Sequence, residues 1–455
     1  MPYVLNTPQD QADMLAAIGV SSVEELFEMV PAELRLDRAL DIPAAMSEME
    51  LTAHMQALSG RTRNADDTVC FLGGGSYDHF IPAVVDYVSG RGEFYTSYTP
   101  YQAEASQGNL QAFFEYQTLI TQLTGMDVSN ASLYDGGSSA SEAVLMCIGA
   151  TRRSGKVVIP ACVHPEYRQI VETFLTNLNV QMEVLETPEG LVQPDQLASI
   201  LDDTTACVLF QQPNFFGGVQ DMKELVEITH KAGALAVVAV DPISLGLLTP
   251  PGSYDADIVV AEGQSLGSPM AFGGPYLGIM ACKEDFVRRM PGRLAGQTVD
   301  RRGKRCWALT LQTREQHIRR ERATSNICTN QGLFALRASV YLAQMGPQGL
   351  RDVANLSLQK SRYAAEQISA NERFSLAFDT PTFKEFVVRD AAGEVESLIK
   401  HALSQGYFAG VPLGQWYPDM ADCFLVCVTE KRTKAEIEGL ATCLAQAPAN
   451  AAAVR

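Results

Sequence analysis

One aspartate and one missing lysine mark the stretch of this chain where chemistry is expected. The apolar run from Ala234 to Val240 predicts a buried strand, and this strand ends in Asp241. A second apolar run, from Ile258 to Ala261, predicts a neighbouring strand. Between Lys231 and Lys283, which opens the next predicted helix, the sequence contains no lysine. The aspartate could hold a protonated ring nitrogen, but no amine follows that could form an imine with a carbonyl group.

The stretch from Asp241 to Pro275 resembles the segment that anchors pyridoxal phosphate (PLP) in enzymes of the aspartate-aminotransferase fold. In such enzymes the aspartate keeps the pyridinium nitrogen protonated, so that the ring can accept electrons, and the next strand delivers the lysine that forms the Schiff base. This sequence has the aspartate and lacks the lysine. Any function inferred for this chain must therefore account for a PLP-type scaffold that lacks the lysine.

Helix-length and strand-length patterns alternate through the middle of the chain. The expected strands are continuous apolar runs, which favour a mostly parallel sheet covered by helices on both faces. We expect a helical arm over residues 1–65, a large domain over residues 66–329, and a small α+β domain over residues 330–455. The predicted fold class is α/β, of the PLP-dependent transferase type (fold type I). The strands expected in the large domain cover residues 156–160, 180–185, 206–211, 235–240, 258–261 and 276–282.

Composition and charge exclude several classes of protein. A net charge of −18 argues against a general nucleic-acid binder, which needs a basic face. The ten cysteines form no CxxC pairs and have no histidines at zinc spacing, so we expect no metal site and a reducing compartment. The first residues lack the pattern of a signal peptide, and no apolar run approaches the roughly 20 residues of a membrane span. The sequence therefore predicts a cytoplasmic protein that binds neither nucleic acid nor membrane.

Two local patterns fit a bound cofactor and also have ordinary structural explanations. Ser138 and Ser139 follow Asp135-Gly136-Gly137 at the start of a predicted helix, where free N–H groups and the helix dipole could hold a phosphate. The same serines are typical of an N-cap. His164 follows a predicted strand and could stack on a pyridine ring, although a lone histidine at a strand end is more often a packing or capping residue.

An aromatic loop precedes a long predicted helix. Tyr95, Tyr98 and Tyr101 lie close together, Pro100 restricts the backbone between them, and Gln102 follows directly. Loops on a rigid scaffold often line pockets, and tyrosine-rich loops are also common at subunit interfaces. Further along, the stretch from Lys283 to Arg322 holds twelve basic and five acidic residues. It is either a docking face for an anionic partner or a solvated, internally paired surface.

Five runs carry a resemblance to a known family: FLGGGSYDHFIPAVV, YTPYQAEASQG, VHPEYRQ, EGQSLGSPMAFGGP and LTLQTREQHIRRERATSNICT. Together, and in this order, they resemble the glycine decarboxylase (P-protein) family of the glycine cleavage system. The resemblance covers nearly the whole chain and is closest to the separate N-terminal-type chain, called alpha or subunit 1. In this family two related subunits of the same fold share the work.

The resemblance implies where the cofactor is bound. The beta-type partner carries the PLP lysine in an HK dipeptide that precedes a proline and a GGP run. Counting back from Pro269 and Gly273-Gly274-Pro275 places Gln264 at the lysine position of this chain. Glutamine cannot form an imine, so PLP is expected on the partner rather than covalently on this chain. Ser138, Ser139, His164 and Asp241 then form a relic of an ancestral cofactor site.

The resemblance also implies the reaction, that of glycine dehydrogenase (aminomethyl-transferring). Glycine loses CO2, and the aminomethyl group passes to the lipoyl arm of the H-protein. This chain would be the non-lysine subunit of an α2β2-type assembly. We expect the loop of Tyr95, Tyr98, Tyr101 and Gln102 to reach into the active site of the partner. We also expect the basic stretch between Lys283 and Arg322 to guide the H-protein.

Two other functions are compatible with the same residues. The chain could be a catalytically silent scaffold or regulator of the PLP-transferase fold. It could also be a stand-alone PLP lyase or transaminase, although the interval without lysine between Lys231 and Lys283 counts against this. Fold alone does not separate these functions.

Overall fold

The computed structural model describes residues 5–36, 38–323 and 325–448, and the chain divides into two compact units, residues 1–63 and 64–455. In the first unit, Thr7 and Ser47 each form a capping box at the start of a helix. None of the described residues of this unit is buried, so it has no core of its own. Its helices are α1 (Pro8–Ile18), two 3-10 turns, η1 (Glu24–Phe27) and η2 (Ala32–Leu34), and α2 (Glu48–Ser59).

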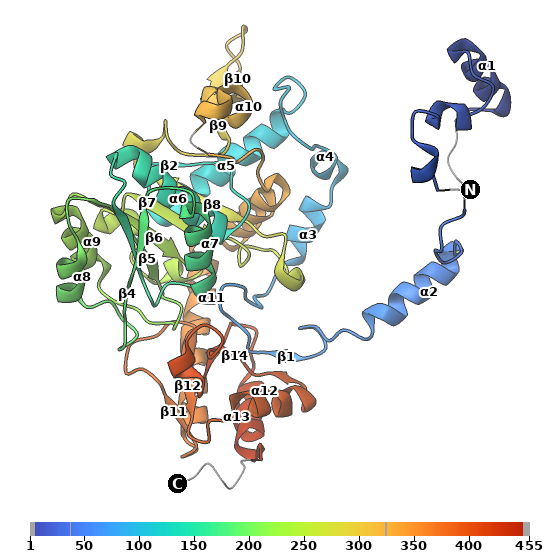
Figure 1. The fold of residues 1–455 in the computed structure, drawn as a ribbon. Coiled ribbons are helices and arrows are strands. Elements are labelled where there is room, and N and C mark those ends of the chain that lie inside the picture. Colours follow the sequence, from blue (N-terminus) through green and yellow to red (C-terminus); the bar gives the residue numbers. More distant parts are fainter. Residues whose placement is uncertain (1–4, 37, 324, 449–455) are drawn as a thin grey trace. The chain divides into compact units, whose positions relative to one another are not determined.

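The second unit is built on a seven-stranded sheet in the order β2-β8-β7-β6-β5-β3-β4 (Figure 1). The strands from β3 to β7 run parallel, while β8 is antiparallel to β7 and β2 is antiparallel to β8. The strands are β2 (Val128–Ser129), β3 (Lys156–Pro160), β4 (Gln181–Leu185), β5 (Thr205–Gln212), β6 (Leu235–Val240), β7 (Ile258–Glu262) and β8 (Gly278–Cys282). The predicted bounds of β3 and β6 are confirmed, and the other four predicted strands are found with shifted ends.

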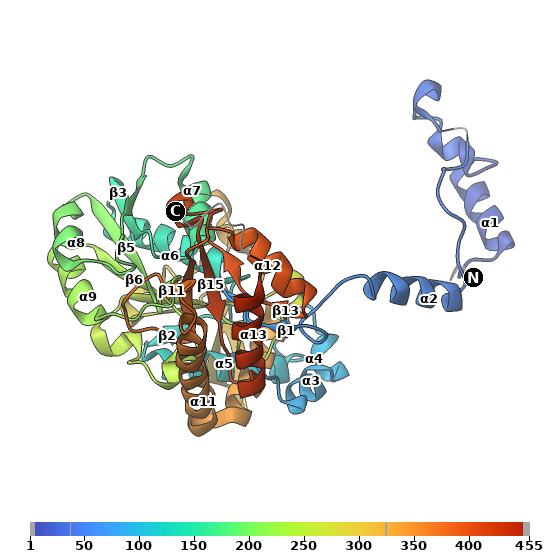
Figure 2. The same cartoon turned by 90° about the horizontal axis from the view of Figure 1, so that it is seen from below.

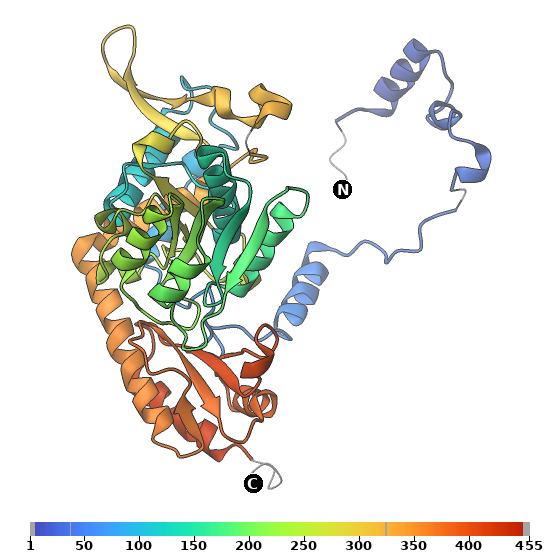
Figure 3. The same cartoon turned by 60° about the vertical axis from the view of Figure 1, so that its left-hand side comes forward.

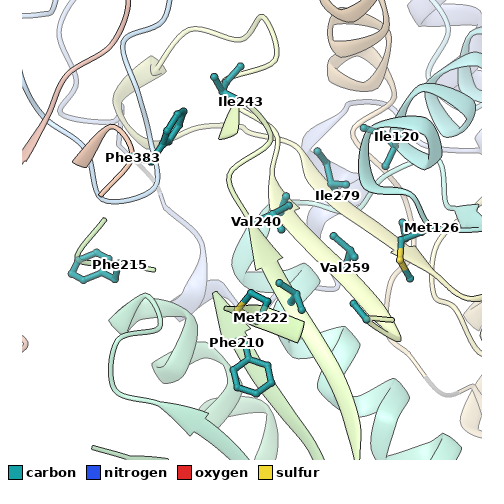
Figure 4. Close-up of a cluster of buried hydrophobic side chains, with 14 of the residues drawn as sticks. Ile120, Met126, Phe210, Phe215, Met222, Val240, Ile243, Val259, Ile279 and Phe383 are labelled. Carbon is teal, nitrogen blue, oxygen red and sulfur yellow. The ribbon is translucent and has the colours of Figure 1, made fainter. Parts of the chain in front are cut away.

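Helices cover both faces of this sheet, because alternate strand residues point to opposite sides. One apolar cluster joins the strands to α6 (Gly136–Thr151) and α7 (Pro165–Leu175). The other joins them to α5 (Gln107–Thr124), α8 (Pro194–Ile200), α9 (Met222–Lys231) and α11 (Gly332–Ser369). Figure 4 shows part of this second cluster, in which Phe210, Val240 and Val259 of the strands lie near Met222 and Ile120 of the helices. The strands are buried on both faces, which explains why their sequences are continuous apolar runs.

The C-terminal part packs helices on a smaller antiparallel sheet of order β11-β12-β15-β14. The helix α11 extends into this part and is kinked at Gly346, where Pro347 cannot donate to the helical ladder. Figure 2 shows α11 beside α13. The elements are β11 (Phe374–Leu376), β12 (Glu385–Asp390), α12 (Val395–Ser404), β14 (Val411–Pro412), β15 (Cys423–Cys427) and α13 (Lys434–Gln446). A short strand, β1 (Val69–Cys70), pairs with β13 (Tyr407–Phe408), so the segment before α3 (Ala83–Ser89) is attached to this part.

A hairpin that the sequence did not predict stands out from the large sheet. It is formed by β9 (Leu294–Val299) and β10 (Arg305–Thr310), and Figure 3 shows it at the end opposite the small sheet. The prediction that Lys283 opens a helix is wrong, because a single 3-10 turn, Glu284–Phe286, follows it. Short helices α4 (Gly92–Tyr95) and α10 (Gln316–Arg319) lie in the loops. Among the described residues, no helix is long and apolar enough to cross a membrane.

Candidate functional site

A small cavity lies where β5, β6 and β7 end. Gln211, Asp241 and Glu262 line it, at or just beyond the carboxyl ends of the three strands. In open α/β sheets this edge is the usual position for a ligand. The cavity has a volume of about 30 Å³. Since one water needs roughly 10–15 Å³ of such space, two waters would fill it.

The predicted carboxylate at the end of β6 is paired with a lysine from the small sheet. Asp241 Oδ2 lies 2.7 Å from Nζ of Lys384, the residue before β12. The Lys384 side chain is 1% exposed and that of Asp241 is 9% exposed. The ammonium also lies 3.3 Å from the ring centroid of Tyr77, in the geometry of a cation–π contact. Asp241 therefore faces a cation supplied by the protein itself.

A histidine and a glutamate extend this ion pair. Lys384 Nζ lies 3.0 Å from Nε2 of His79, and Nδ1 of His79 lies 2.6 Å from Glu430. An ammonium can only donate hydrogen bonds, so Nε2 must accept and Nδ1–H must donate to the carboxylate. The resulting chain of contacts runs from Asp241 through Lys384 and His79 to Glu430. It joins the large sheet, the segment before α3 and the small sheet.

Gln264, assigned to the lysine position by the family resemblance, holds backbone instead of pointing at open space. Its Oε1 accepts from the N–H of Tyr77 at 2.9 Å, and its Nε2 donates to the carbonyl oxygens of Tyr77 and Ser268. The side chain is buried. Both polar atoms of Gln264 are thus committed to closing the segment around Tyr77 over the end of the sheet.

The predicted serines at the start of α6 are engaged within their own helix turn. Asp135 caps the helix, and its Oδ1 accepts from the N–H of Ser138 at 2.7 Å. The Ser139 hydroxyl donates to the Asp135 carbonyl oxygen at 2.9 Å. Neither serine lines the cavity. The structure therefore places Ser138 and Ser139 in the first turn of α6, behind Asp135, which is the N-cap.

The carboxylate of Glu262 lies at the N-terminal end of α6, where a phosphate or another anion would be expected. Glu262, at the end of β7, accepts from the N–H of Gly136 at 2.9 Å with Oε2. Its Oε1 accepts from the N–H groups of Gln264 and Leu277 at 2.9 and 3.0 Å. Burial raises the pKa of Glu262 to about 7, while these three N–H donors favour the charged form. The free donor at the helix N-terminus is therefore met by a side chain.

His164 caps the next helix and stacks on a tyrosine of the same chain. Its Nδ1 accepts from the N–H of Glu166 at 3.2 Å, and its Nε2 lies 2.7 Å from the carbonyl oxygen of Gly74, to which it donates. The ring is stacked on Tyr167, with centroids 4.6 Å apart. Burial lowers the pKa of His164 to about 4, so the imidazole is neutral at physiological pH. One face of the His164 ring is therefore covered by Tyr167, and His164 also lines the cavity at Asp241.

The aromatic loop lies apart from this cavity. Tyr95 and Tyr98 line a groove of about 400 Å³ beside α5 and the start of α11, which shares no lining residue with the cavity at Asp241. Tyr98 is 93% exposed. Tyr101 does not line the groove, and its ring instead faces the guanidinium of Arg293, 5.5 Å from the centroid. Gln102 is exposed.

Gln107, the first residue of α5, and Arg293 hold the two sides of this loop against the rest of the second unit. Gln107 Oε1 accepts from the N–H of Trp307 in β10 at 2.9 Å, and Gln107 Nε2 donates to the Trp307 carbonyl oxygen at 2.8 Å. Arg293 is buried and donates to Asn330 Oδ1 at 2.7 Å, which fixes the guanidinium against Tyr101. The loop and the hairpin β9–β10 therefore form one connected surface.

The basic stretch is divided between paired and free cations. Lys283 forms ion pairs with Asp255 and Asp257 at 2.8 and 2.7 Å. At the turn of the hairpin, by contrast, three exposed cations make no ion pair with any residue that the structure describes. These are Arg301, Arg302 and Lys304. Only part of the predicted stretch offers free positive charge.

Four residues that line the cavity were not predicted from the sequence. Lys384 and Glu385 are neighbouring charged residues within the strand-like stretch 382–388 of the sequence, and charges inside a strand are a signal for a buried polar contact. Glu262 ends β7 just as Asp241 follows β6, so the same signal was present twice. For Tyr77, beside the glycines of FLGGGSY, no local signal exists.

Residues 1–444 match the family described as "Glycine cleavage system P-protein". The chain belongs to the glycine cleavage system P-protein family. It is 50% identical over 441 residues to the probable glycine dehydrogenase (decarboxylating) subunit 1 of Desulforamulus reducens, covering 97% of this chain and 98% of that one. The protein of the same description from Carboxydothermus hydrogenoformans is 50% identical over 444 residues, with coverage of 97% and 98%.

Solved structures agree with this family and with the predicted fold class. A crystal structure of glycine decarboxylase (P-protein) of the glycine cleavage system, in inhibitor-bound form, matches with a TM-score of 0.90 at 37% identity, covering 98% of this chain and 100% of that chain. Glutamate decarboxylase of Lactobacillus brevis, at 13% identity and a TM-score of 0.68, covering 94% of this chain and 96% of that one, shares the fold alone. The predicted α/β fold of the PLP-dependent transferase type is confirmed.

The fold implies PLP, and the residues around Asp241 do not fit it. The position that faces the carboxylate is taken by the Lys384 ammonium, and the N-terminus of α6 faces the Glu262 carboxylate. No lysine lies between β7 and β8, and Gln264 is held by the backbone of Tyr77. The remaining space of about 30 Å³ has room for about two waters and not for a pyridine ring. No step of a reaction is therefore assigned to this cavity.

Proposed function

We propose that this chain is the non-lysine subunit of a two-subunit glycine dehydrogenase (decarboxylating), and that a related partner subunit carries the PLP. Membership of the P-protein family, together with relatives described as subunit 1, supports a role in glycine decarboxylation within the glycine cleavage system. The observation that carries the division of labour is the buried ion pair between Lys384 and Asp241. It sets a cation of this chain where a cofactor ring would have to lie.

The proposed reaction joins glycine, a PLP-bearing subunit and a lipoyl carrier, the H-protein. Glycine is decarboxylated, and the remaining aminomethyl group is transferred to the lipoyl group of the carrier. Because the cavity of this chain is too small for a pyridine ring, its contribution lies at its surface. PLP supplies the electron-accepting ring to the partner's site.

The aromatic loop is the proposed contribution to the partner's active site. Tyr98 presents nearly its whole side chain to solvent, which is unusual for a tyrosine unless a partner covers it. Tyr101 is held by Arg293, and the helix that follows the loop is fixed by the bonds between Gln107 and Trp307. The exposed rings and hydroxyls are thus carried on a fixed base, as positioning of a substrate requires. Tyr95, Tyr98, Tyr101 and Gln102 are the residues proposed for this role.

The turn of the hairpin is the proposed guide for the H-protein. Arg301, Arg302 and Lys304 gather positive charge at one exposed turn of a chain whose net charge is −18. Such a local field attracts an anionic partner and raises the rate of encounter, with a strong dependence on salt.

Reduction with borohydride tests the division of labour. The chain alone, its candidate partner alone and the mixture are each incubated with PLP, reduced, and measured by intact mass. We expect only the partner to gain the reduced cofactor, and glycine decarboxylation to need both chains. Stoichiometric labelling of this chain alone would refute the proposal, and a peptide map would then identify the lysine, with Lys384 as the first candidate.

The same assembly separates a contributing subunit from a silent scaffold. A scaffold role predicts that substitutions in the aromatic loop leave kcat unchanged as long as the two chains still associate. The proposed role predicts a lower kcat for Tyr98→Ala in a complex of unchanged mass. Association is measured by size-exclusion chromatography with light scattering, and kcat by release of CO2 from glycine.

A further inference from the structure

The cavity at Asp241 holds two side chains of opposite charge at the two ends where PLP-type enzymes anchor their cofactor. A pyridinium nitrogen needs a carboxylate partner, and a phosphate is favoured at a helix N-terminus. We propose that Lys384 and Glu262 are built-in substitutes for these two groups of the cofactor, so that the chain folds around its own side chains in place of PLP. This inference rests on the fold and the contacts, and it stands whether or not a partner subunit performs the chemistry.

At the cationic end, Lys384 compensates a carboxylate that is otherwise buried without a counter-ion. Asp241 receives one further bond, from the N–H of Ile243 at 3.1 Å, which does not balance its charge. The ammonium lies 2.7 Å from it, between the ring of Tyr77 and Nε2 of His79. All of these partners come from elements that also border the cavity. The Lys384 ammonium is therefore held in one position by Asp241, Tyr77 and His79.

At the anionic end, Glu262 and Tyr167 fill the space in front of α6. Glu262 accepts the N–H of Gly136, as a phosphate oxygen would do. A Cβ atom added at Gly136 would lie 3.0 Å from Glu262 Cβ and would collide with the hydroxyl of Tyr167. The next residue, Gly137, is packed against Ile170 in the same way. Glu262 therefore occupies the position in front of the Gly136 N–H, and both glycines are closely packed.

A glycine-rich segment then covers both ends. Glu385 accepts from the N–H of Gly74 at 2.6 Å and from the hydroxyl of Tyr77 at 3.0 Å. Gln264 holds the N–H and the carbonyl oxygen of Tyr77 from the other side. Burial raises the pKa of the Tyr77 hydroxyl, which keeps it protonated as the donor to Glu385. The segment is thus held closed by side chains that replace a ligand.

Restoring the cofactor site step by step tests the inference. The full-length chain is prepared as Gln264→Lys, as Gln264→Lys with Lys384→Met, and as both with Glu262→Ser. Each protein is incubated with PLP or with pyridoxal, which lacks the phosphate, and is then reduced with borohydride. The lysine amine and the aldehyde lose water to form an imine, which borohydride converts into a stable secondary amine that adds mass to the chain.

Each variant has its own expected label at residue 264. The single variant should gain neither compound, because Lys384 still faces Asp241. The double variant should gain pyridoxal and little PLP, because Glu262 still meets Gly136. The triple variant should gain PLP stoichiometrically, and PLP should raise its melting temperature. A matched triple variant with Gln264→Met should gain no label at position 264.

Three results would overturn the inference. They are stoichiometric PLP on the single variant, equal labelling of the double variant by PLP and pyridoxal, and binding of PLP by the unaltered chain in equilibrium dialysis. If the triple variant is recovered unfolded, the double variant keeps the bonds of Glu262 and decides the question through its preference for pyridoxal. The proposed division of labour fails separately, when the unaltered chain decarboxylates glycine without a partner.

Discussion

Lys384→Met removes one member of a buried ion pair, and its cost follows from what it leaves behind. Lys384 is 1% exposed and Asp241 is 9% exposed, so the remaining carboxylate stays in a nearly dry site, where the N–H of Ile243 donates to it. Breaking a buried pair in this way costs about 3–5 kcal/mol. With an unfolding entropy of about 2 cal/mol/K per residue, the unit of residues 64–455 should then melt about 4–6 °C lower.

The second arm of the experiment removes both charges. Asp241→Asn alone leaves an ammonium without its carboxylate and should also be destabilising. Lys384→Met with Asp241→Asn leaves no buried charge in the pair, and replacing a buried pair by neutral groups is often close to neutral. The double variant should therefore be more stable than either single variant. This difference is the coupling free energy of the pair.

Unfolding in urea, followed by circular dichroism, measures the four proteins of this cycle. The control is Lys400→Met on α12, where the lysine is 78% exposed and its nitrogen lies 3.8 Å from Glu396. That substitution should change the free energy of unfolding by less than about 0.5 kcal/mol. If the two single effects at Lys384 and Asp241 simply add, the two side chains do not act as a pair, and the reasoning is refuted.

Three further expectations concern the pH dependence, the loop and the hairpin. Burial lowers the pKa of His164 to about 4, so the folded chain takes up this proton at a lower pH than the unfolded chain does. As the pH falls from 6.5 to 4, the free energy of unfolding of the unaltered chain should fall by about 3 kcal/mol relative to that of His164→Gln. A constant difference between the two free energies would contradict this. Tyr98→Ala should leave stability unchanged but lower the kcat of the assembled enzyme roughly 10–100-fold, whereas Tyr87→Ala on α3, also exposed, should not. Arg301→Glu with Arg302→Glu should raise KM for the H-protein and weaken its dependence on salt at unchanged kcat. An unaltered salt dependence would rule out a role for that turn.

The large sheet could be predicted from the sequence because each strand is specified by its own residues. The runs that became β3 and β6 are continuous and apolar, and both ends of each strand match the prediction. Asp241 could be singled out for the same local reason, as an acid directly after a buried strand. Its partner could not, because Lys384 comes from a distant segment that reaches Asp241 only after the small sheet has packed on the large one.

The surface features were harder to predict, for a different reason. The segments of β9 and β10 carry weak apolar alternation, and the charges around Gly303 indicated only a docking stretch, so the hairpin was not predicted. Tyr95 and Tyr101 are near neighbours in the sequence but face different surroundings, because Arg293 holds one of them. Whether a side chain is exposed, and which residue it contacts, depends on tertiary packing. The spacing of residues along the chain does not determine either.

The filled cavity makes the specialisation of this chain difficult to reverse in evolution. A change of Gln264 to lysine alone would bring a second ammonium toward Tyr77, whose ring already faces the ammonium of Lys384. Loss of Lys384 alone would strand the charge of Asp241. Each single step toward a cofactor-binding chain is therefore expected to be less stable than the starting sequence. The return of a cofactor to the interior of this chain would therefore require several substitutions at once, including changes at both Gln264 and Lys384.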